Sequence, residues 1–307
     1  LEFRRVSSDL MAVVIASGGT LLFAMHSVVN GSLAGEGRWR GYGTLVGTES
    51  GSRLALITLL VLLAARSDRL NAAEFGTALA AGSWMLLVLF SRDHREAFRA
   101  QCDRGLREML ATSGRSMTGA IGNSIILVGF PVLLSLTTPA HEYARAAPFL
   151  LAISLTRAPI MLPLSAFQSM VITHFMETSD RRSVLLRLGA AVSGVTLIGA
   201  GLAAVVGPPL MQLLFGPSYR VGSAALAVLT VAAGLIALET IVGALLMALA
   251  RHRTYAVAWL TTACVSAAVL LLPNPMPTRA MLALTVGPAV GIVVQLVSLS
   301  RHSLSGL

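Results

Sequence analysis

The stretch SLTRAPIMLPLSAFQSMVITHF, residues 154–175, raises the question on which the fold depends. It is apolar enough to lie in lipid, yet it contains Arg157 and two prolines, Pro159 and Pro163. Arginine keeps its charge in proteins, and proline removes a hydrogen bond from the helix interior. The stretch therefore either lies outside a membrane or presents its charge to something other than lipid.

The composition of the chain favours the second alternative. Of its 307 residues 55% are apolar and 12% are charged, and the mean hydropathy is +0.77. A soluble domain usually carries about twice that share of charge. Apolar runs near the roughly 20 residues needed to cross a bilayer recur along most of the chain. The sequence therefore predicts an all-α polytopic membrane protein.

About nine segments meet this length criterion. We expect spans at 10–33, 44–65, 73–91, 109–137, 147–173, 185–206, 222–250, 256–272 and 280–300.

The net charge of +9 comes with arginine alone, because the chain contains no lysine. We interpret this first as the codon bias of a GC-rich genome. Alternate connectors hold roughly twice as many arginines as the others, and by the positive-inside rule they are cytoplasmic. This places the N-terminus of the chain outside and its C-terminus in the cytoplasm. Aromatic stacking platforms and soluble basic domains are missing, so nucleic acid is not an expected partner.

One connector differs from the rest. In SRDHREAFRAQCDRGLREML, residues 91–110, apolar residues recur every four positions on a charged background, which predicts an amphipathic helix. Its arginines suit anionic lipid headgroups, and a solvated linker is the alternative. The chain then divides into 1–91 with three helices, an amphipathic cytoplasmic linker at 92–108, and 109–307 with six helices.

Three stretches together resemble the polysaccharide flippases of the multidrug/oligosaccharidyl-lipid/polysaccharide exporter superfamily. VVNGSLAGEGRWRGYGTLVGTESGSRLALI (28–57) is similar to their fourth-to-fifth helix region, and AHEYARAAPFLLAISLTRAPIMLPLSAFQSMV (140–171) to their eighth helix and the loop before it. MQLLFGPSYRVGSAALAVL (211–229) is similar to their ninth-to-tenth connection.

The resemblance implies twelve or more helices in two six-helix lobes around a central cavity, in a bacterial inner membrane. On this alignment the chain begins at about the fourth helix, so 1–91 is a partial N-terminal lobe and 109–307 a complete C-terminal lobe.

No motif for catalysis is evident in the sequence. There is no HExxH, GxSxG, Walker A or aspartate-rich metal pattern, and Cys102 and Cys264 stand alone. We therefore expect no enzyme, no cofactor and no metal site. Without a nucleotide motif, transport would be driven by a gradient or by coupled substrate flow.

Arg157 is the first candidate for substrate binding. It lies about ten residues into its span, or roughly 15 Å from the helix end, where snorkelling is difficult. An arginine in mid-bilayer costs about 3 kcal/mol on insertion scales, whereas facing a wet cavity or a carboxylate costs less. A guanidinium fork suits the diphosphate of a polyprenyl-linked sugar, and the resemblance implies the same role. The alternative is an ion pair with Glu239.

The other polar residues of the spans leave more alternatives open. Glu239 is a candidate proton or sodium carrier, a partner for Arg157, or a hydrogen-bonded carboxyl. Glu49 and Arg53 are four residues apart on one helix face, where they are expected to neutralise each other, although Arg53 is also a substrate-binding candidate. Arg115 either contacts substrate or snorkels. Four more polar residues either line a cavity or form interhelical hydrogen bonds, which is the commoner explanation: His26, Asn123, Gln168 and Gln295.

The sequence therefore predicts a flippase that moves a lipid-linked saccharide, or a similar polysaccharide precursor, outward by rocking of two lobes. Membrane lipids and the polymerase or glycosyltransferases of the same route are the expected partners. A drug/cation antiporter of the same superfamily is the alternative within transport. A non-transporting scaffold for envelope assembly is the alternative outside it.

Overall fold

The computed structural model describes residues 2–64, 69–99 and 105–303, and the secondary structure in these ranges is helical. The expected all-α class is thus confirmed. The helices are α1 (Glu2–Gly35), α2 (Trp39–Leu63), α3 (Arg69–Ala80), α4 (Trp84–Phe90), α5 (Arg92–Phe98), α6 (Leu106–Leu127), α7 (Phe130–Thr137), α8 (Ala140–Tyr143), α9 (Ala147–Glu177), α10 (Arg181–Phe215), α11 (Ser223–Ala248), α12 (His252–Val269) and α13 (Met276–Ser303).

Within the described ranges, six helices are long and apolar enough to cross a membrane. They are the helices at Val13–Gly35, Trp39–Leu63, Ala147–Glu177, Arg181–Phe215, Ser223–Ala248 and Met276–Arg301. Two bent helix pairs raise this number to at most eight. The expected nine spans are therefore not all supported. The expected span 256–272 corresponds to α12, whose first residues, His252 and Arg253, lower its mean hydropathy.

Both bent pairs contain a break that the hydropathy pattern does not show. The expected span 109–137 divides into α6 and α7, which meet at 63°. Pro131 lies in the first turn of α7 and has no N–H to offer to the carbonyl four residues earlier. In the expected span 73–91, a turn separates α3 from α4, and the helical segment Phe75–Phe90 then meets α5 at 108°.

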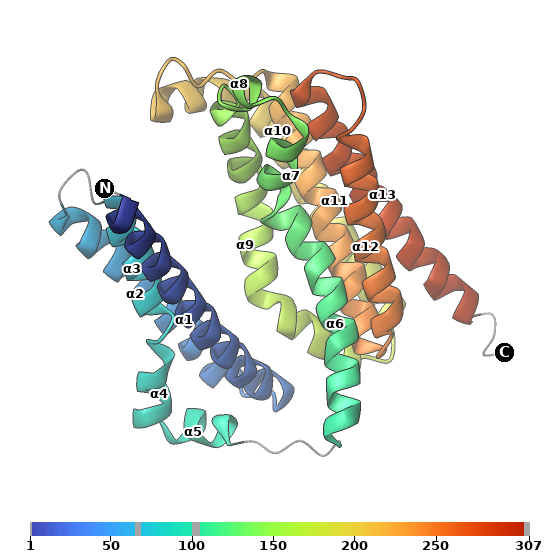
Figure 1. Cartoon of the computed structure of the whole chain (residues 1–307). Helices are drawn as coiled ribbons and strands as arrows, with labels where there is room; N and C mark the ends of the chain where they lie inside the picture. The colour runs from blue at the N-terminus through green and yellow to red at the C-terminus, as the bar shows by residue number, and fades with distance from the viewer. Residues whose placement is uncertain (1, 65–68, 100–104, 304–307) are drawn as a thin grey trace. The chain divides into compact units, whose positions relative to one another are not determined.

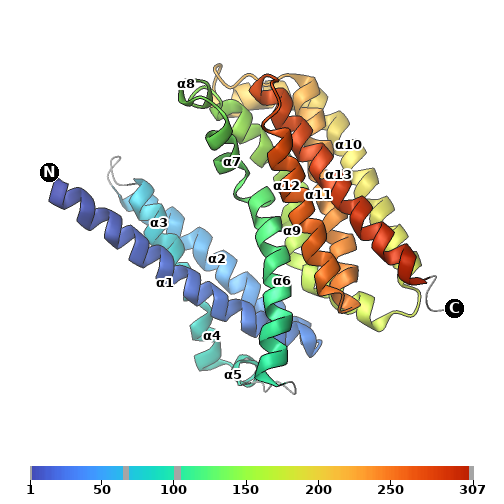
Figure 2. The same cartoon turned by 45° about the vertical axis from the view of Figure 1, so that its right-hand side comes forward.

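The chain forms two compact units, residues 1–103 and 104–307, and the boundary between them falls in the expected linker 92–108. In the first unit α1, α2 and α3 pack on one another, and α4 and α5 follow at one end (Figures 1 and 2). The core of this unit is small. It consists of the buried residues Val29, Leu33, Leu45, Trp84 and Ala97.

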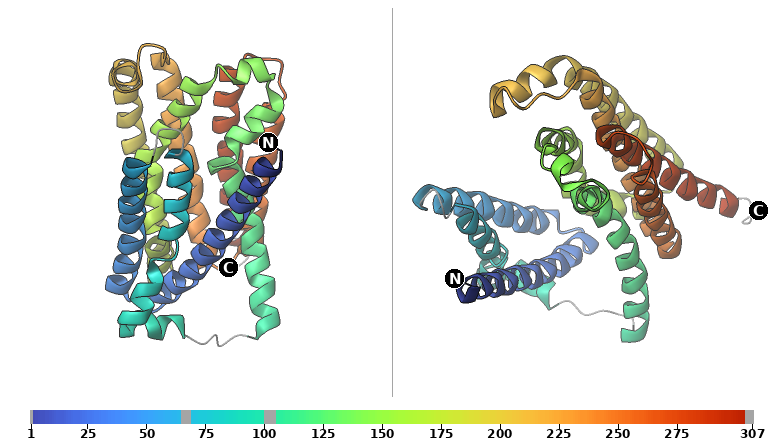
Figure 3. Two further views of the ribbon diagram at one scale, coloured as in Figure 1. Left: turned by 60° about the vertical axis from the view of Figure 1, so that its left-hand side comes forward. Right: turned by 45° about the horizontal axis from the view of Figure 1, so that its top comes forward.

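The amphipathic helix expected over 91–110 is not continuous. The α5 helix ends at Phe98, Arg99 forms a turn, and α6 begins at Leu106, while residues 100–104, with Cys102, lie outside the described ranges. Figure 3 shows α5 at an angle to the helices of its unit.

Side chains of α5 hold it to the neighbouring elements of the first unit. Buried His94 lies 3.0 Å from the carbonyl oxygen of Gly41 and 2.8 Å from the Ser91 hydroxyl. Arg38 pairs with Asp93 at 2.8 Å and with Glu36 at 3.1 Å. The hydrogen bond with Glu36 is the main reason why the pKa of Arg38 is raised. These contacts fix the start of α5 next to the connection between α1 and α2.

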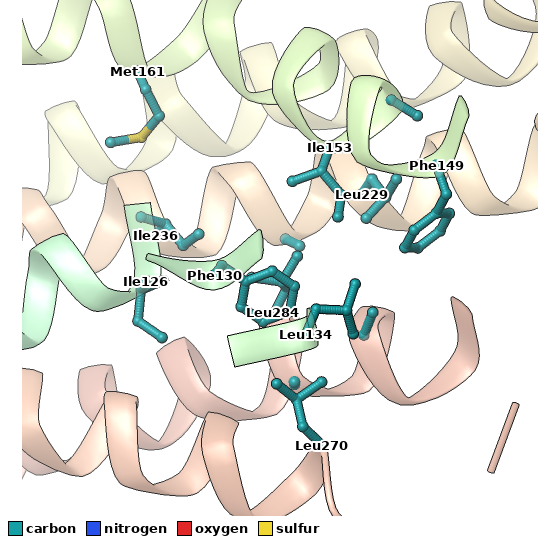
Figure 4. Packing of buried hydrophobic residues seen from close by; sticks show 14 of the residues in the cluster. Ile126, Phe130, Leu134, Phe149, Ile153, Met161, Leu229, Ile236, Leu270 and Leu284 are labelled. Carbon is teal, nitrogen blue, oxygen red and sulfur yellow. The ribbon is translucent and has the colours of Figure 1, made fainter. Parts of the chain in front are cut away.

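In the second unit α11 is the central helix. It packs against α9, α10, α12 and α13. Of its most apolar stretch, 67% is buried inside the protein, compared with 11% for α10. Figure 4 shows the core around it, where Phe130 and Leu134 of α7 lie among aliphatic side chains of the longer helices. The outward faces of the long helices are apolar, as expected for surfaces that contact lipid.

Two glycines allow α6 and α12 to approach closely. A Cβ atom on Gly119 would overlap the ring of Tyr255, and one on Gly122 would lie 2.7 Å from the carbonyl of Trp259. Small residues at such positions let membrane helices pack with their backbones close together. Because the obstacle at Gly122 is main chain, it has little freedom to move.

We predict that Gly122→Ala destabilises the second unit by about 1–3 kcal/mol, the usual cost of overpacking. Gly114→Ala is the matched control on the same helix, since its Cβ atom would meet nothing within 4 Å. The thermal stability of both variants in detergent, followed by fluorescence-detected gel filtration, checks this expectation. Equal melting temperatures for the two variants would contradict the close approach of α6 and α12.

Candidate functional site

Arg157 lies on α9 and reaches the break between α6 and α7. Its Nη1 atom donates to the carbonyl oxygens of Ile126 at 3.0 Å and Leu127 at 2.9 Å. These are the last two residues of α6. The permanent charge in the apolar stretch 154–175 therefore serves main-chain acceptors of a neighbouring helix.

The end of α6 needs such a donor. The last carbonyls of a helix have no partner within it, and in hydrocarbon no water replaces that partner. The N–H groups of Val128 and Gly129 both bond to the Ser124 carbonyl. The carbonyl of Leu127 would face Pro131, which has no N–H. A cation at this end also interacts favourably with the helix dipole, by about 0.3–2 kcal/mol.

Three other arginines bind near the C-terminal ends of helices in the same way. Arg95 donates to Val88 and Leu89 of α4, Arg181 donates to Phe175 of α9, and Arg279 donates to Leu270 after α12. The guanidinium group is suited to this role because it carries five donors and no acceptor. Sequence reasoning missed this use of arginine, because the acceptors are main-chain atoms and leave no pattern of side chains.

Arg157 keeps part of its hydrogen-bonding capacity. Within the described ranges, its Nε and Nη2 atoms have no hydrogen-bond partner. Gln168, another substrate-binding candidate, lies eleven residues later on α9, about three turns away, and thus near the same face. It is half-buried and makes no hydrogen bond to another described residue.

Glu239 lies in the centre of the second unit. Its side chain is 0% exposed, and its Oε1 atom accepts a hydrogen bond of 2.5 Å from the hydroxyl of Thr262 on α12. Its Oε2 atom has no partner in the described part of the chain. The expected alternative, an ion pair between Arg157 and Glu239, is wrong, because Arg157 binds carbonyls and no pair between them forms among the described residues.

Gly291 and Gln295 of α13 complete the surroundings of this carboxyl group. A Cβ atom on Gly291 would overlap both Thr262 and Glu239, so that only glycine lets α13 approach here. Gln295, one turn further, is 0% exposed, and both of its amide atoms lack partners within the described ranges. Buried polar groups without partners are uncommon in folded proteins. The sequence offers only one signal for this site, which is polar residues spaced within apolar helices.

In the first unit, Glu49 and Arg53 form the ion pair that their spacing predicts. Glu49 is buried, whereas 39% of the Arg53 side chain is exposed. Two aromatic rings adjoin the pair. The guanidinium of Arg53 lies 5.9 Å from the ring centroid of Phe23, which stacks on the ring of His26.

The interhelical hydrogen bonds expected for His26, Asn123 and Gln295 are not among those that the described residues form. In the described part of the chain, His26 and Gln295 have no hydrogen-bond partner, and neither does the side-chain oxygen of Asn123. Arg115 is exposed on α6, eleven residues before Ile126 and thus about 16 Å along the helix from the break. The candidate site residues therefore do not form one cluster: some lie in the first unit and others at separate positions in the second unit.

Metal-binding chemistry finds no support within the described ranges. They contain no group of three or more His, Cys, Asp or Glu side chains that could hold a metal ion. Cys264 is a free, exposed thiol.

We predict that Thr262→Val destabilises the protein by about 1–3 kcal/mol, because it leaves both carboxyl oxygens of Glu239 buried without a partner. Thr261→Val is the matched control, since the Thr261 hydroxyl bonds to the carbonyl of Val257 in its own helix. Denaturation of both variants in detergent micelles measures the difference. A Thr262→Val variant no less stable than the control would show that the hydrogen bond to Glu239 contributes nothing.

Comparison with known proteins identifies relatives over nearly the whole chain. "Uncharacterized protein Rv1510" of Mycobacterium tuberculosis is 36% identical over 304 residues, which cover 98% of this chain and 68% of that protein. "Uncharacterized protein Mb3654" of Mycobacterium bovis is 37% identical over 294 residues, 95% of this chain and 67% of that protein. No protein-family model and no solved structure matches the chain. At this identity and coverage, the chain belongs to the same family as these mycobacterial proteins.

Proposed function

We propose that this protein is a membrane transporter that moves a lipid-linked saccharide, or a similar polysaccharide precursor, out of the cytoplasmic leaflet of a bacterial cell membrane. The observation that carries this proposal is the state of Arg157, a cation at a helix break within a membrane-spanning segment, with two donor atoms unused. The three stretches that resemble polysaccharide flippases support the same substrate class.

The geometry of Arg157 suits a phosphate group. Its two bonds to α6 fix the guanidinium plane through Nη1 alone. Nε and Nη2 form the other edge of the plane, which can donate two parallel hydrogen bonds to phosphate oxygens. A guanidinium that is oriented in advance loses less freedom when it binds. A lipid diphosphate is thus a ligand that this edge can hold in the apolar interior of a membrane.

The break between α6 and α7 is consistent with alternating access. Discontinuous helices in transporters line the substrate pathway, where their free ends meet polar groups. Here Arg157 binds the last carbonyls of α6 at the break. Glu239 provides a buried carboxyl group on the central helix, α11. We propose Glu239 as an ion-coupling residue, because one of its oxygen atoms is unpartnered.

The same carboxyl group is the reason to keep a second candidate function. A drug/cation antiporter of the same superfamily would use a buried acid to attract its cationic substrate. Glu239 fits that role, whereas the free edge of Arg157 favours an anionic ligand. The polymerase and glycosyltransferases of a polysaccharide route remain proposed partners.

The function can be tested in a host that lacks its lipid-linked-saccharide flippase. We expect the wild-type protein, expressed together with any segments that flank this chain, to restore surface polysaccharide. Arg157→Ala should lose this activity. Arg157→Lys keeps a cation at the end of α6 but lacks the second donor edge, so it should fold normally and still restore at least about tenfold less, the equivalent of about 1.4 kcal/mol.

Arg182→Ala provides the matched control, because Arg182 is exposed on α10 and makes no hydrogen bond to a described residue. Membrane abundance of all variants is measured by immunoblotting. Full activity of Arg157→Lys would restrict Arg157 to stabilising the helix break. Failure of the wild type in every matched host would favour the antiporter, or a scaffold that does not transport.

A further inference from the structure

A second group of polar residues lies within the membrane-spanning part of the first unit. His26 is nine residues before the end of α1, and Glu49 is ten residues after the start of α2. Both are therefore about 14–15 Å from the connection between the two helices, at the same depth. Arg53 lies one turn further along α2 and pairs with Glu49.

His26 has no satisfied hydrogen bond at this depth. The residue is 4% exposed, and neither ring nitrogen has a partner in the described part of the chain. The main-chain carbonyl of Leu45 on α2 is close enough to interact with the ring. A buried imidazole without partners is unfavourable, and such groups usually have a reason for being kept. Stacking on Phe23, with centroids 5.6 Å apart, holds the ring in place.

Two opposite charges lie near His26. Arg53 pairs with Glu49, and its guanidinium lies 5.9 Å from the ring centroid of Phe23, which stacks on His26. An imidazolium at His26 would attract Glu49 and repel Arg53. Both imidazolium nitrogens donate, so the Glu49 carboxylate and the Leu45 carbonyl are available acceptors.

We propose that His26 is a proton-binding site within the membrane-spanning part of the first unit, with Glu49 as the carboxylate that stabilises its protonated form. The proton binds to a ring nitrogen, and the imidazolium then competes with Arg53 for Glu49. Protonation thereby loosens the Glu49–Arg53 pair and releases the half-exposed guanidinium of Arg53 for another anion. That the proton drives transport rests on the proposed function, whereas proton binding itself does not.

The other helices that pack on α1 leave this interaction undisturbed. The described side chains of α3, at 72, 73 and 75–80, include no titratable group. On α5, His94 contacts Gly41, and Asp93 and Glu96 contact Arg38, all near the connection between α1 and α2, about 14 Å from the depth of His26. The other two titratable residues of α5 are Arg92, which pairs with Glu96, and Arg95, which donates to carbonyls of α4. Glu49 and Arg53 are therefore the charged groups that face His26 from the described parts of the elements packed on α1.

Other ligands fit this site less well. A metal ion needs more ligands than His26 and Glu49, and the described ranges contain no suitable group of three. An anion would be repelled by the buried carboxylate of Glu49. A proton needs only the ring nitrogen and a nearby negative charge, and both are present.

The proposal can be tested by nuclear magnetic resonance of the full chain, labelled with ¹⁵N-histidine, in lipid nanodiscs. The His26 signal is the one that disappears in His26→Gln and shifts in Phe23→Leu, which removes the stacked ring. We expect this signal to change from neutral imidazole to imidazolium as the pH is lowered from about 7 to about 4. In Glu49→Gln, about tenfold more protons should be needed for the same change, because the stabilising charge is gone.

His141→Gln is the control variant, because His141 is exposed on α8 in the other unit. It should remove a different signal and leave the His26 titration unchanged. The proposal is overturned if His26 stays neutral down to about pH 4 or titrates identically in Glu49→Gln. If Glu49→Gln does not fold, the wild-type titration decides. The measurement requires no transport, so a titrating His26 in a protein that restores no polysaccharide would reject the flippase and retain the proton site.

Discussion

A helix that ends inside hydrocarbon must find donors for its last carbonyl groups, and this constraint governs the second unit. The α6 helix stops at Leu127, ahead of Pro131, and its carbonyls are bound by Arg157 from α9. These bonds link α9 to the end of α6 at the break between α6 and α7. Without them, polar main-chain atoms would remain unpaired where no water replaces the donor. The charge of Arg157 is therefore accommodated by the carbonyls that the break leaves free, and these carbonyls obtain their donor from Arg157.

The same constraint gives the arginines of this chain a structural role. The absence of lysine from the sequence is interpreted here as codon bias. Such bias does not explain why Arg95, Arg181 and Arg279 also donate to carbonyls near helix ends. A planar group with five donors can satisfy a helix end and still bind a second acceptor. Arg157 does the first and retains the capacity for the second, which makes one residue both structural and a candidate for binding.

Buried polar groups without partners occur at both candidate sites, as they do at several other places in the described interior. Glu239 and Gln295 lie among α11, α12 and α13, and His26 lies between the first two helices. At the first site, Gly291 lets α13 approach Glu239 closely. At the second, Glu49 pairs with Arg53, and His26 has no hydrogen bond to either of them. Such sites destabilise a membrane protein unless something else compensates. This physical cost is the common argument for the roles proposed for them.

Composition and apolar runs were sufficient to predict an all-helical membrane protein and the location of most long helices, because burial in lipid requires about 20 apolar residues in succession. The spacing of Glu49 and Arg53 likewise predicted their pair. The breaks at Pro131 and after α3 and the short α5 were not predictable from hydropathy, which averages over a window. The partner of Arg157 was decided by tertiary structure alone. Its acceptors are main-chain carbonyls about 30 residues away, and every residue has such an atom, so no sequence pattern marks the ones that are left free.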